Sequence, residues 1–293
     1  MVDAADVCVL IPTLNEAETI AGVIDGFHEH GFEEVLVVDG HSTDDTAAIA
    51  RERGARVITQ DGAGKGNAVQ QGLEAIEEPY VLLVDGDGTY RPADAGQMIA
   101  PLDDGGVDHV IGNRFADLRP GAMTRLNQIG NRLINRVFAF IHGRNLQDIL
   151  SGYRAFSRRS IEQMRLTAQG FGIETQMAVE CIRNNVPTAV VDITYKPRPD
   201  QSTTNLRPFR DGGVILSTLY RLAKTTNPLF YFGSLSAVSG ALALSVGVFV
   251  VYDWVVNGIP HQVLAMVSVF GLLFAFQLLT FGVLTDMIVR LRR

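Results

Sequence analysis

The chain has 293 residues, enough for one sizeable domain and an appendage, and 47% of them are hydrophobic, which is high for a soluble enzyme. Its formal net charge of −7 argues against nucleic-acid binding, because proteins bind the phosphate backbone mainly through Lys and Arg. The two cysteines, Cys8 and Cys181, have apolar neighbours and no metal-type spacing, so we expect both in the core.

Short apolar runs alternate with helical patterns along the first two thirds of the chain. The expected strands are residues 7–11, 35–38, 57–59, 80–84, 107–111 and 187–195. The expected helices between the first four strands are residues 16–27, 46–53 and 65–76. Such alternation predicts an α/β fold, with a mostly parallel sheet and helices on both of its faces.

The segment VLLVDGDGTY, residues 81–90, places Asp85 and Asp87 on a glycine-rich turn directly after a buried strand. In open α/β sheets, ligands bind beyond the carboxyl ends of the strands. Hard divalent ions such as Mg²⁺ and Mn²⁺ prefer oxygen ligands. We therefore predict a catalytic metal site at Asp85 and Asp87; the alternative is a turn in which Asp and Gly only end the strand.

The ends of the first three strands also carry polar residues. They are PTLNE at residues 12–16, DGHSTD at 39–44 and GAGKG at 62–66. Three strand ends that meet at one crevice are typical of a ligand site, although Ser42 and Asp44 could instead cap the following helix. The glycine loop lacks the GxGxxG spacing and has Gly66 where a Walker motif needs Ser or Thr, which argues against a dehydrogenase and an ATPase.

Basic residues follow the fifth expected strand. Arg114 stands just after it, and arginine can bind a phosphate through two parallel charge-assisted hydrogen bonds. Residues 123–141 form a basic amphipathic pattern that includes Arg125 and Arg132. This helix could lie on a membrane surface or pack on the sheet, and the sequence leaves both alternatives open.

Two uncharged stretches near the C-terminus, residues 229–252 and 263–285, contain 24 and 23 residues, enough to cross a bilayer core of ~30 Å. The alternative is two buried helices of a soluble core. Basic residues flank the pair, and the ten-residue connection contains none, so we expect the catalytic domain and both termini on the cytoplasmic side of the cell membrane. Gly233, Gly240 and Gly247 give the first span a small-residue face for hairpin packing or for a homodimer.

The ordered motifs PTLNE, VVDGHSTDDT, GAGKGNA, DGDG, VIGNRF and DILSGYRAF resemble family 2 glycosyltransferases of the GT-A fold, in particular the dolichyl-phosphate hexosyltransferases. The resemblance implies a GT-A domain at residues 1–206, a juxtamembrane helix at 207–228 and a two-helix transmembrane hairpin at 229–293. It also implies inverting, metal-dependent transfer of a hexose, glucose or mannose, from a nucleotide sugar to dolichyl phosphate for protein N-glycosylation.

The resemblance implies a role for individual residues as well. Pro12, Asn15, Glu16, Asp39, Lys65 and Asp85 would bind the nucleotide, while Asp85 and Asp87 would bind Mg²⁺ or Mn²⁺. Arg114, Arg125, Arg132, Ser151, Arg154 and Ser202 would bind the acceptor, Glu174 and Gln176 the sugar, and Asp87, Arg114 and Arg198 would be catalytic. For the segments around Arg154 and Glu174, a buried Arg–Glu pair would give the same pattern.

Two departures from the family pattern leave details open. Gly40 and His41 replace the usual acid–glycine step, which leaves the base open, and Thr89 stands where relatives often have Gln, which leaves a third metal ligand open. Similarity to haloarchaeal members that begin N-glycan assembly for S-layer glycoproteins, together with the acidic, lysine-poor composition, favours UDP-glucose over GDP-mannose.

Two other functions compete with this prediction. A processive polysaccharide synthase normally carries a QxxRW motif and more spans, whereas the sole tryptophan, Trp254, lies in the connection between the two spans. The other alternative is a membrane-tethered nucleotide-sugar sensor without catalytic activity.

Overall fold

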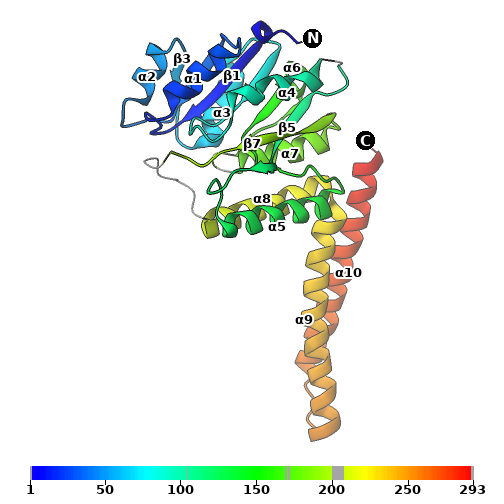
Figure 1. The fold of residues 1–293 in the computed structure, drawn as a ribbon. Coiled ribbons are helices and arrows are strands. Elements are labelled where there is room, and N and C mark those ends of the chain that lie inside the picture. Colours follow the sequence, from blue (N-terminus) through cyan, green and yellow to red (C-terminus); the bar gives the residue numbers. More distant parts are fainter. Residues whose placement is uncertain (1, 104, 169, 171, 200–207, 292–293) are drawn as a thin grey trace. The chain divides into compact units, whose positions relative to one another are not determined.

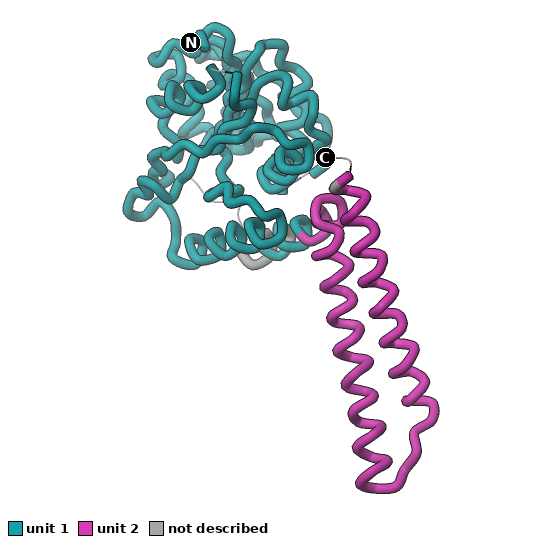
Figure 2. Tube along the Cα trace, turned by 90° about the vertical axis from the view of Figure 1, so that its right-hand side faces the viewer, with its two compact units in different colours: residues 1–219 teal, residues 220–293 magenta. Residues whose placement is uncertain are grey.

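The structure, a computed structural model, describes residues 2–103, 105–168, 170, 172–199 and 208–291. The chain divides into two compact units, Met1–Leu219 and Tyr220–Arg293 (Figure 2). Each unit is described here by itself. The first contains the sheet and the second contains two long helices (Figure 1).

The first unit is built on a seven-stranded sheet with the order β3-β2-β1-β4-β6-β5-β7 (Figure 1). The strands are β1 (Val7–Thr13), β2 (Val35–Asp39), β3 (Arg56–Thr59), β4 (Tyr80–Leu83), β5 (His109–Leu118), β6 (Arg154–Ser157) and β7 (Thr188–Tyr195). Only β6 runs antiparallel to its neighbours, β4 and β5. The mostly parallel α/β fold expected from the sequence is therefore confirmed.

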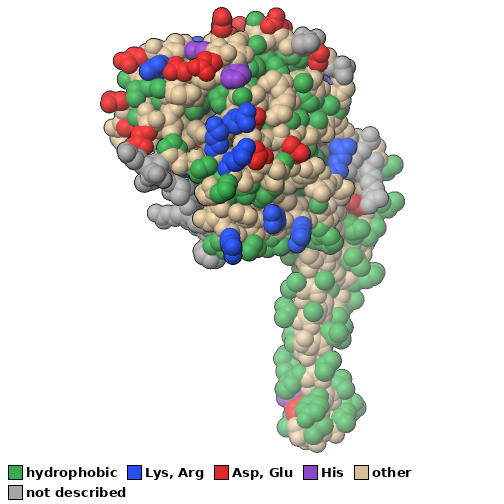
Figure 3. Space-filling model, viewed as in Figure 1, with side chains coloured by type: hydrophobic (Ala, Val, Ile, Leu, Met, Phe, Trp, Pro, Cys, Tyr) green, Lys and Arg blue, Asp and Glu red, His purple; other side chains and the backbone are tan. Residues whose placement is uncertain are grey.

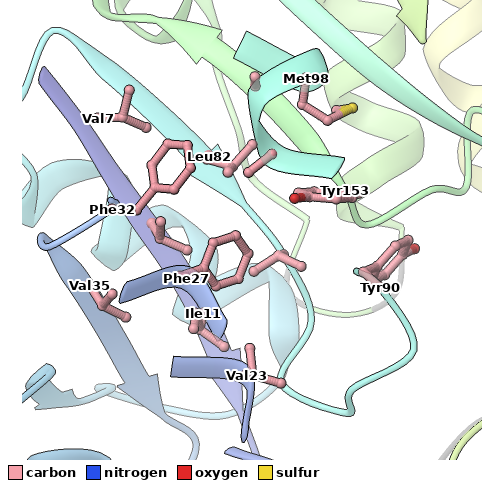
Figure 4. Packing of buried hydrophobic residues seen from close by; sticks show 14 of the residues in the cluster. Val7, Ile11, Val23, Phe27, Phe32, Val35, Leu82, Tyr90, Met98 and Tyr153 are labelled. Carbon is pink, nitrogen blue, oxygen red and sulfur yellow. The ribbon is translucent and has the colours of Figure 1, made fainter. Parts of the chain in front are cut away.

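Helices cover both faces of this sheet. They are α1 (Ile20–Glu29), α2 (Thr46–Glu52), α3 (Lys65–Ala75), α4 (Ala95–Ile99), α6 (Arg158–Gln163) and α7 (Ile173–Arg183), with short 3-10 turns at Ala4–Asp6, Pro92–Asp94 and Ala100–Leu102. Alternate residues of β1 belong to two core clusters on opposite faces of the sheet. Ile11 belongs to the cluster that contains residues of α1 and α4 (Figure 4), and Leu10 belongs to the cluster that contains residues of α3 and α7. All seven residues of β1 are buried, as expected for a strand covered on both faces.

Strand β1 continues two residues beyond the expected end and includes Pro12. Pairing with β4 ends at Leu10, whose carbonyl accepts from the Val84 amide. The backbone N–H and C=O groups of successive residues in a strand point to opposite sides, so the backbone nitrogen of Pro12 faces the same side as the Leu10 carbonyl. At Pro12, the hydrogen-bonded pairing with β4 has already ended. The amide hydrogen that proline lacks would therefore have no partner there, and β1 tolerates the proline.

Two other expected boundaries differ from the structure, and one strand was not expected. Helix α1 begins at Ile20 rather than residue 16, because the amides of Glu16 and Ala17 donate to Thr46, the first residue of α2, and to Asp44 in the loop before it. Strand β5 runs on to Leu118, so Arg114 lies within the strand and not after it. Strand β6 has only four residues, and its apolar pattern is too short to have been predicted.

Two further helices follow patterns seen in the sequence. Helix α5 (Arg125–His142) begins at Thr124, whose hydroxyl accepts from the Asn127 amide, and ends at Gly143, which has a left-handed φ of 69°. A glycine at that position ends a helix without steric cost. Helix α8 (Pro208–Thr226) lies where the juxtamembrane helix was expected, and its place beside a membrane stays a prediction.

Helices α9 (Pro228–Asn257) and α10 (Gln262–Leu291) form a hairpin in the second unit, and each is long and apolar enough to cross a membrane. Most of their apolar side chains are exposed, and the visible surface of the hairpin is mainly apolar (Figure 3). Large exposed apolar surfaces mark sites of contact with lipid or protein, so the hairpin could cross a bilayer.

Small and hydroxyl residues pack the two helices of the hairpin together. The Ser236 hydroxyl donates to the Ala275 carbonyl at 2.7 Å, and the Ser268 hydroxyl donates to the Ala243 carbonyl at 2.8 Å. A Cβ on Gly247 would lie only 2.6 Å from Ser268 Oγ. The small-residue face thus serves contact within one chain. A homodimer through these helices stays a prediction.

Candidate active site

Side chains at the carboxyl ends of adjacent strands enclose a cavity of about 210 Å³ in the first unit. The lining comes from residues after β1, β2, β3 and β4, from α3 and from the segment after β7: Pro12, Thr13, Leu14, Glu16, Gly40, Gln60, Gly64, Lys65, Ala68, Asp85, Gly86, Asp87 and Arg198. Six predicted site residues meet here, namely Pro12, Glu16, Lys65, Asp85, Asp87 and Arg198. The cavity therefore lies where open α/β sheets bind ligands.

Asp87 is nearly buried and strongly held. Its Oδ1 accepts hydrogen bonds from the Thr89 amide at 3.0 Å and the Thr89 hydroxyl at 2.5 Å, and its Oδ2 lies 2.6 Å from Nη2 of Arg198. These contacts fix the carboxylate in one orientation. Thr89, where the family often has Gln, thus supports Asp87.

Asp85 is paired through Lys65, the first residue of α3. The Lys65 Nζ lies 2.5 Å from Asp85 Oδ1 and 2.5 Å from Glu174 Oε1 on α7. Burial alone would lower the pKa of Lys65, but Asp85 and Glu174 together raise it well above its ordinary value. Lys65 is therefore a permanent positive charge between two carboxylates.

Glu16 is the third carboxylate of the cavity. Burial and the nearby charge of Asp87 raise its pKa to about 7, against the opposing effect of Arg198, whose Nη1 lies 3.9 Å from Glu16 Oε1. A further cation near Glu16 would relieve its repulsion from Asp87. The electrostatics of the cavity thus favour uptake of positive charge.

The donor set of the cavity fits a hard divalent ion. Asp85 and Asp87 offer carboxylate oxygens at the end of β4, and among the residues that the structure describes no three His, Cys, Asp or Glu side chains form a complete metal cage. Mg²⁺ commonly uses one or two carboxylates and completes its shell with substrate phosphates and water. An ion bound here would therefore need oxygens from a ligand.

Buried oxygen atoms without partners among the described residues belong to two residues that line the cavity, Thr13 and Gln60, and to Asp39, which precedes the lining residue Gly40. They are Thr13 Oγ1, Asp39 Oδ1 and Gln60 Oε1, which come from the adjacent ends of β1, β2 and β3. The second oxygen of Asp39 accepts from the Ser42 amide at 3.1 Å. Buried polar atoms normally have partners, so an unsatisfied group of this kind indicates a ligand that supplies them.

Asn15 links the loop after β1 to the loop after β2. Its backbone has a left-handed φ of 57°, and its side-chain Oδ1 accepts from the Thr43 amide at 2.8 Å. Its own amide donates to the Ser42 hydroxyl at 2.9 Å. Asn15 therefore braces the loop between β2 and α2, and so do Ser42 and Asp44, which were alternatively expected only to cap α2.

Gly152 packs directly against Asp85. A Cβ at this position would lie 2.6 Å from Asp85 Oδ2, and the Gly152 amide donates to the Tyr90 hydroxyl at 2.9 Å. Contact below 3.0 Å forces one partner to move, so only glycine leaves Asp85 in place. This restraint was not apparent from the motif SGYR alone.

We expect Gly152→Ala to lower the turnover rate about 100-fold or more. The added Cβ would displace Asp85, and a shift of about 1 Å in a group at a reaction site can lower the rate by about that factor. The measurement is steady-state turnover together with thermal unfolding of the full chain. Gly22→Ala is the matched control, since a Cβ there meets nothing within 4 Å. Equal activity of Gly152→Ala and wild type would show that Asp85 needs no such restraint.

Residues 8–165 match the family model "Glycosyl transferase family 2", which covers more than half of the chain. The chain belongs to glycosyltransferase family 2. The GT-A fold and the enzyme class expected from the motifs, a glycosyltransferase, are therefore confirmed.

Curated relatives narrow the comparison. The glycosyltransferase is 59% identical over 288 residues to glycosyltransferase AglJ of Haloferax volcanii, covering 98% of this chain and 95% of that protein. It is 33% identical to a dolichyl-phosphate hexose transferase of the same organism, covering 74% of this chain and 93% of that protein. A polyprenol monophosphomannose synthase of Mycolicibacterium smegmatis is 31% identical, over 65% of this chain and 77% of that protein.

A solved structure shares the fold. Glucosyl-3-phosphoglycerate synthase from Mycobacterium tuberculosis, in complex with Mn²⁺, uridine-diphosphate-glucose and phosphoglyceric acid, aligns with a TM-score of 0.61 at 26% identity. The alignment covers 74% of this glycosyltransferase and 79% of that chain.

Arg114 of the glycosyltransferase lies within β5 and is almost fully buried. Its Nε and Nη2 donate to the two carboxylate oxygens of Asp148 at 2.7 and 2.8 Å, and its guanidinium lies 5.4 Å from the centre of the Tyr195 ring. Asp148 has no exposed surface. The two parallel bonds that a phosphate was expected to receive are thus given to a carboxylate in this structure.

Arg154 and Ser151, two further predicted acceptor residues, are fully buried. The Arg154 guanidinium donates to the carbonyls of Ser151 and Ile149 and contacts His109. These bonds shape the turn that presents Gly152 to Asp85. The structure therefore argues against direct acceptor binding by Arg154, and the Arg–Glu alternative does not describe it either, because its direct partners are carbonyls and a histidine.

Gln176, predicted to bind sugar, is also enclosed. Its Oε1 accepts from the amides of Thr167 and Ala168, and its Nε2 donates to the Arg165 carbonyl. The side chain thus fixes the segment before α7, which leaves it unavailable to a sugar in this conformation. The sequence could not predict this role, because a Gln in a motif does not reveal which backbone groups it contacts.

The remaining acceptor candidates differ in position. Arg125 and Arg132 are exposed on α5, and Arg132 lies 5.6 Å from the centre of the Phe115 ring. Ser202 lies outside the described residues. Sequence reasoning missed Thr13, Gln60 and Asp148; the position of Gln60 directly after β3, like that of Asp39 at the end of β2, was the available signal.

Proposed function

We propose that this glycosyltransferase transfers a hexose, with inversion, from a nucleotide sugar to dolichyl phosphate, in a reaction that needs Mg²⁺ or Mn²⁺, and so supplies a lipid-linked sugar for protein N-glycosylation. The observation that carries the proposal is the cleft in which Asp85 and Asp87, each paired with a cation, share the lining with Thr13 and Gln60, whose buried oxygens have no partner among the described residues. The relatives named as a dolichyl-phosphate hexose transferase and a polyprenol monophosphomannose synthase support the acceptor class.

The donor would occupy the cleft along its length. A nucleobase with a ring N–H would satisfy Asp39 Oδ1, and uracil and guanine both have one, which leaves UDP-glucose and GDP-mannose as donors. Glucose is favoured by the acidic, lysine-poor composition and by the sequence resemblance described above. Lys65 and Arg198 would then contact the diphosphate, because both point into the same cavity as Asp85 and Asp87.

The chemistry follows from charge placement. A divalent ion held by Asp85 and Asp87 supplies charge neutralisation for the departing nucleoside diphosphate. Lys65 and Arg198 add fixed positive charge on the same side, which stabilises the negative charge that develops as the bond to the sugar breaks. The acceptor phosphate already carries negative charge near neutral pH, so no residue needs to remove a proton from it.

Positively charged residues would bring the acceptor phosphate to the sugar. Arg114 contributes a buried positive charge near Tyr195, and exposed Arg125 and Arg132 compete for direct contact with the lipid phosphate. Attack from the face opposite the leaving group gives inversion, from an α-linked donor to a β-linked lipid product. Glu174 acts through Lys65, with which it is paired.

Helix α5 supports contact with a membrane. Ile134, Phe138 and Ile141 on one side are buried, while Leu126, Ile129, Leu133 and Phe140 form an exposed apolar stripe on another. Exposed arginines border that stripe, and such helices bind anionic lipid surfaces. The two alternatives for this helix, packing on the protein and lying on lipid, are therefore compatible.

The hairpin α9–α10 would anchor the enzyme in the cell membrane, with both termini and the catalytic domain cytoplasmic because the basic residues flank the hairpin and its connection has none. Such an anchor holds the cleft at the leaflet that contains the acceptor phosphate. Dolichyl phosphate then needs to diffuse only within the bilayer.

The test is a transfer assay with the full chain in liposomes that contain dolichyl phosphate. Radiolabelled UDP-glucose, GDP-mannose and other nucleotide sugars are supplied separately with Mg²⁺ or Mn²⁺, and lipid extracts are analysed for labelled dolichyl phosphate-hexose. We expect one donor to give this product and EDTA to abolish it. Polymer in place of the lipid product would instead indicate a processive synthase, and binding without turnover would indicate a sensor.

A further inference from the structure

Lys65 lies between two carboxylates that differ in access to the cleft. Its Nζ is 2.5 Å from an oxygen of Asp85 and 2.5 Å from an oxygen of Glu174. Asp85 lines the cavity and its side chain is 26% exposed, whereas Glu174 is not among the lining residues and its side chain is 6% exposed. Lys65 therefore has one partner at the cleft and one partner behind it.

A divalent ion at Asp85 would lie close to the Lys65 ammonium, which already contacts one oxygen of that carboxylate. Both would seek the same carboxylate, and like charges within a few ångström repel strongly in a partly buried site. Asp87 has the same arrangement, since Arg198 Nη2 lies 2.6 Å from its Oδ2. The two carboxylates that would bind a metal are thus neutralised by protein cations when no ligand is present.

A diphosphate gives both cations another partner. It carries several negative charges and many acceptor oxygens, and Lys65 and Arg198 line the cavity that would receive it. When the cations turn to the diphosphate, Asp85 and Asp87 become available to a metal. Each ligand then assists the other, and this mutual effect is reciprocal by thermodynamic necessity.

From this geometry we propose that Lys65 couples the binding of a divalent metal to the binding of a nucleoside diphosphate, and that Glu174 is the positioning residue that retains Lys65 when Asp85 takes up the metal. The inference rests on the proposed function, because it concerns the same metal and nucleotide. This role of Glu174, the positioning of Lys65, requires no contact with the sugar.

The wild-type expectation concerns binding alone. We expect UDP, or GDP in a parallel arm, to raise the affinity for Mn²⁺ about tenfold or more, within the usual range of coupling between two sites. Purified full-length protein is titrated with Mn²⁺, with and without nucleoside diphosphate, and free Mn²⁺ is measured by electron paramagnetic resonance. The ratio of the two dissociation constants is the coupling factor.

Two variants should change the coupling factor in opposite directions. In Lys65→Met, Asp85 is available from the start, so Mn²⁺ alone binds more tightly and the coupling factor falls at least threefold. In Glu174→Gln, Lys65 has no second carboxylate to pair with when it leaves Asp85. Mn²⁺ alone therefore binds more weakly. A bound diphosphate restores a negatively charged partner for Lys65, so the coupling factor rises. Glu180→Gln is the matched control, because Glu180 is a buried, ion-paired residue of α7 that contacts Arg183 and not Lys65.

The outcomes separate this inference from the proposed function. If only the net charge of the site mattered, both variants would change the affinity for Mn²⁺ but leave the coupling factor as in wild type. That result would overturn the inference, while the metal site itself would remain supported. If neither Mn²⁺ nor a nucleoside diphosphate bound the wild-type protein at all, both the inference and the proposed function would fail.

Discussion

Replacing Asp87 by Asn should lower the rate of sugar transfer about a thousandfold or more, which corresponds to about 4 kcal/mol of transition-state stabilisation. The exchange preserves shape but removes a charge that Arg198, Thr89 and a bound metal all need. Initial rates in the dolichyl phosphate assay measure the effect. We expect thermal unfolding and membrane association of the variant to remain close to wild type, because the amide still fills the same space.

Asp25→Asn is the control for this change. Asp25 lies on α1, and its pair with Arg53 is exposed on both sides, so its removal should have little effect on folding or transfer. Transfer by Asp87→Asn within tenfold of wild type would contradict a metal-binding role for Asp87.

Removing Arg114 should have the largest effect on stability. In Arg114→Ala the carboxylate of Asp148, which has no exposed surface, loses both guanidinium hydrogen bonds and stays buried. Breaking a buried ion pair in this way costs about 3–5 kcal/mol, which lowers the melting temperature by about 6–20 °C in a unit of this size. Differential scanning fluorimetry of the purified full chain measures the shift.

Two comparison variants show whether the buried charge is the cause. The double variant Arg114→Met/Asp148→Leu removes both charges and should regain most of the lost stability, since apolar replacements of buried ion pairs are often neutral. Arg53→Ala, which breaks an exposed pair, should shift the melting temperature by no more than about 4 °C. A small shift in melting temperature for Arg114→Ala would mean that the ion pair with Asp148 is not needed for stability. That result would favour a role for Arg114 in binding the acceptor phosphate.

The sequence predicted the elements that depend on long apolar runs. The strands around β1, β2 and β4 and both long helices of the hairpin were found because their burial or length is visible in local composition. Strand β6 was missed because four residues between polar neighbours carry no clear period. Its antiparallel pairing with β4 and β5 depends on contacts distant in sequence.

Some residues of the site could be predicted from local sequence, and others could not. Carboxylates on strand ends, such as Asp85 and Asp87, were predictable because the sheet topology brings these ends together. The enclosure of Arg154 and Gln176 was not, since their partners are backbone groups whose directions are set only in the folded chain. The close packing of Gly152 on Asp85 belongs to the same class, because two segments 67 residues apart in the chain meet there.

The central claim is that a divalent ion and a nucleoside diphosphate bind together at the end of β4. The most direct test is a diffraction experiment on crystals of the full chain grown with Mn²⁺ and UDP or GDP, with data collected at the manganese absorption edge. The expected result is an anomalous peak between the carboxylates of Asp85 and Asp87, with diphosphate oxygens beside it. An ordered nucleotide with the peak elsewhere, or with Lys65 and Arg198 still on those carboxylates, would contradict the account.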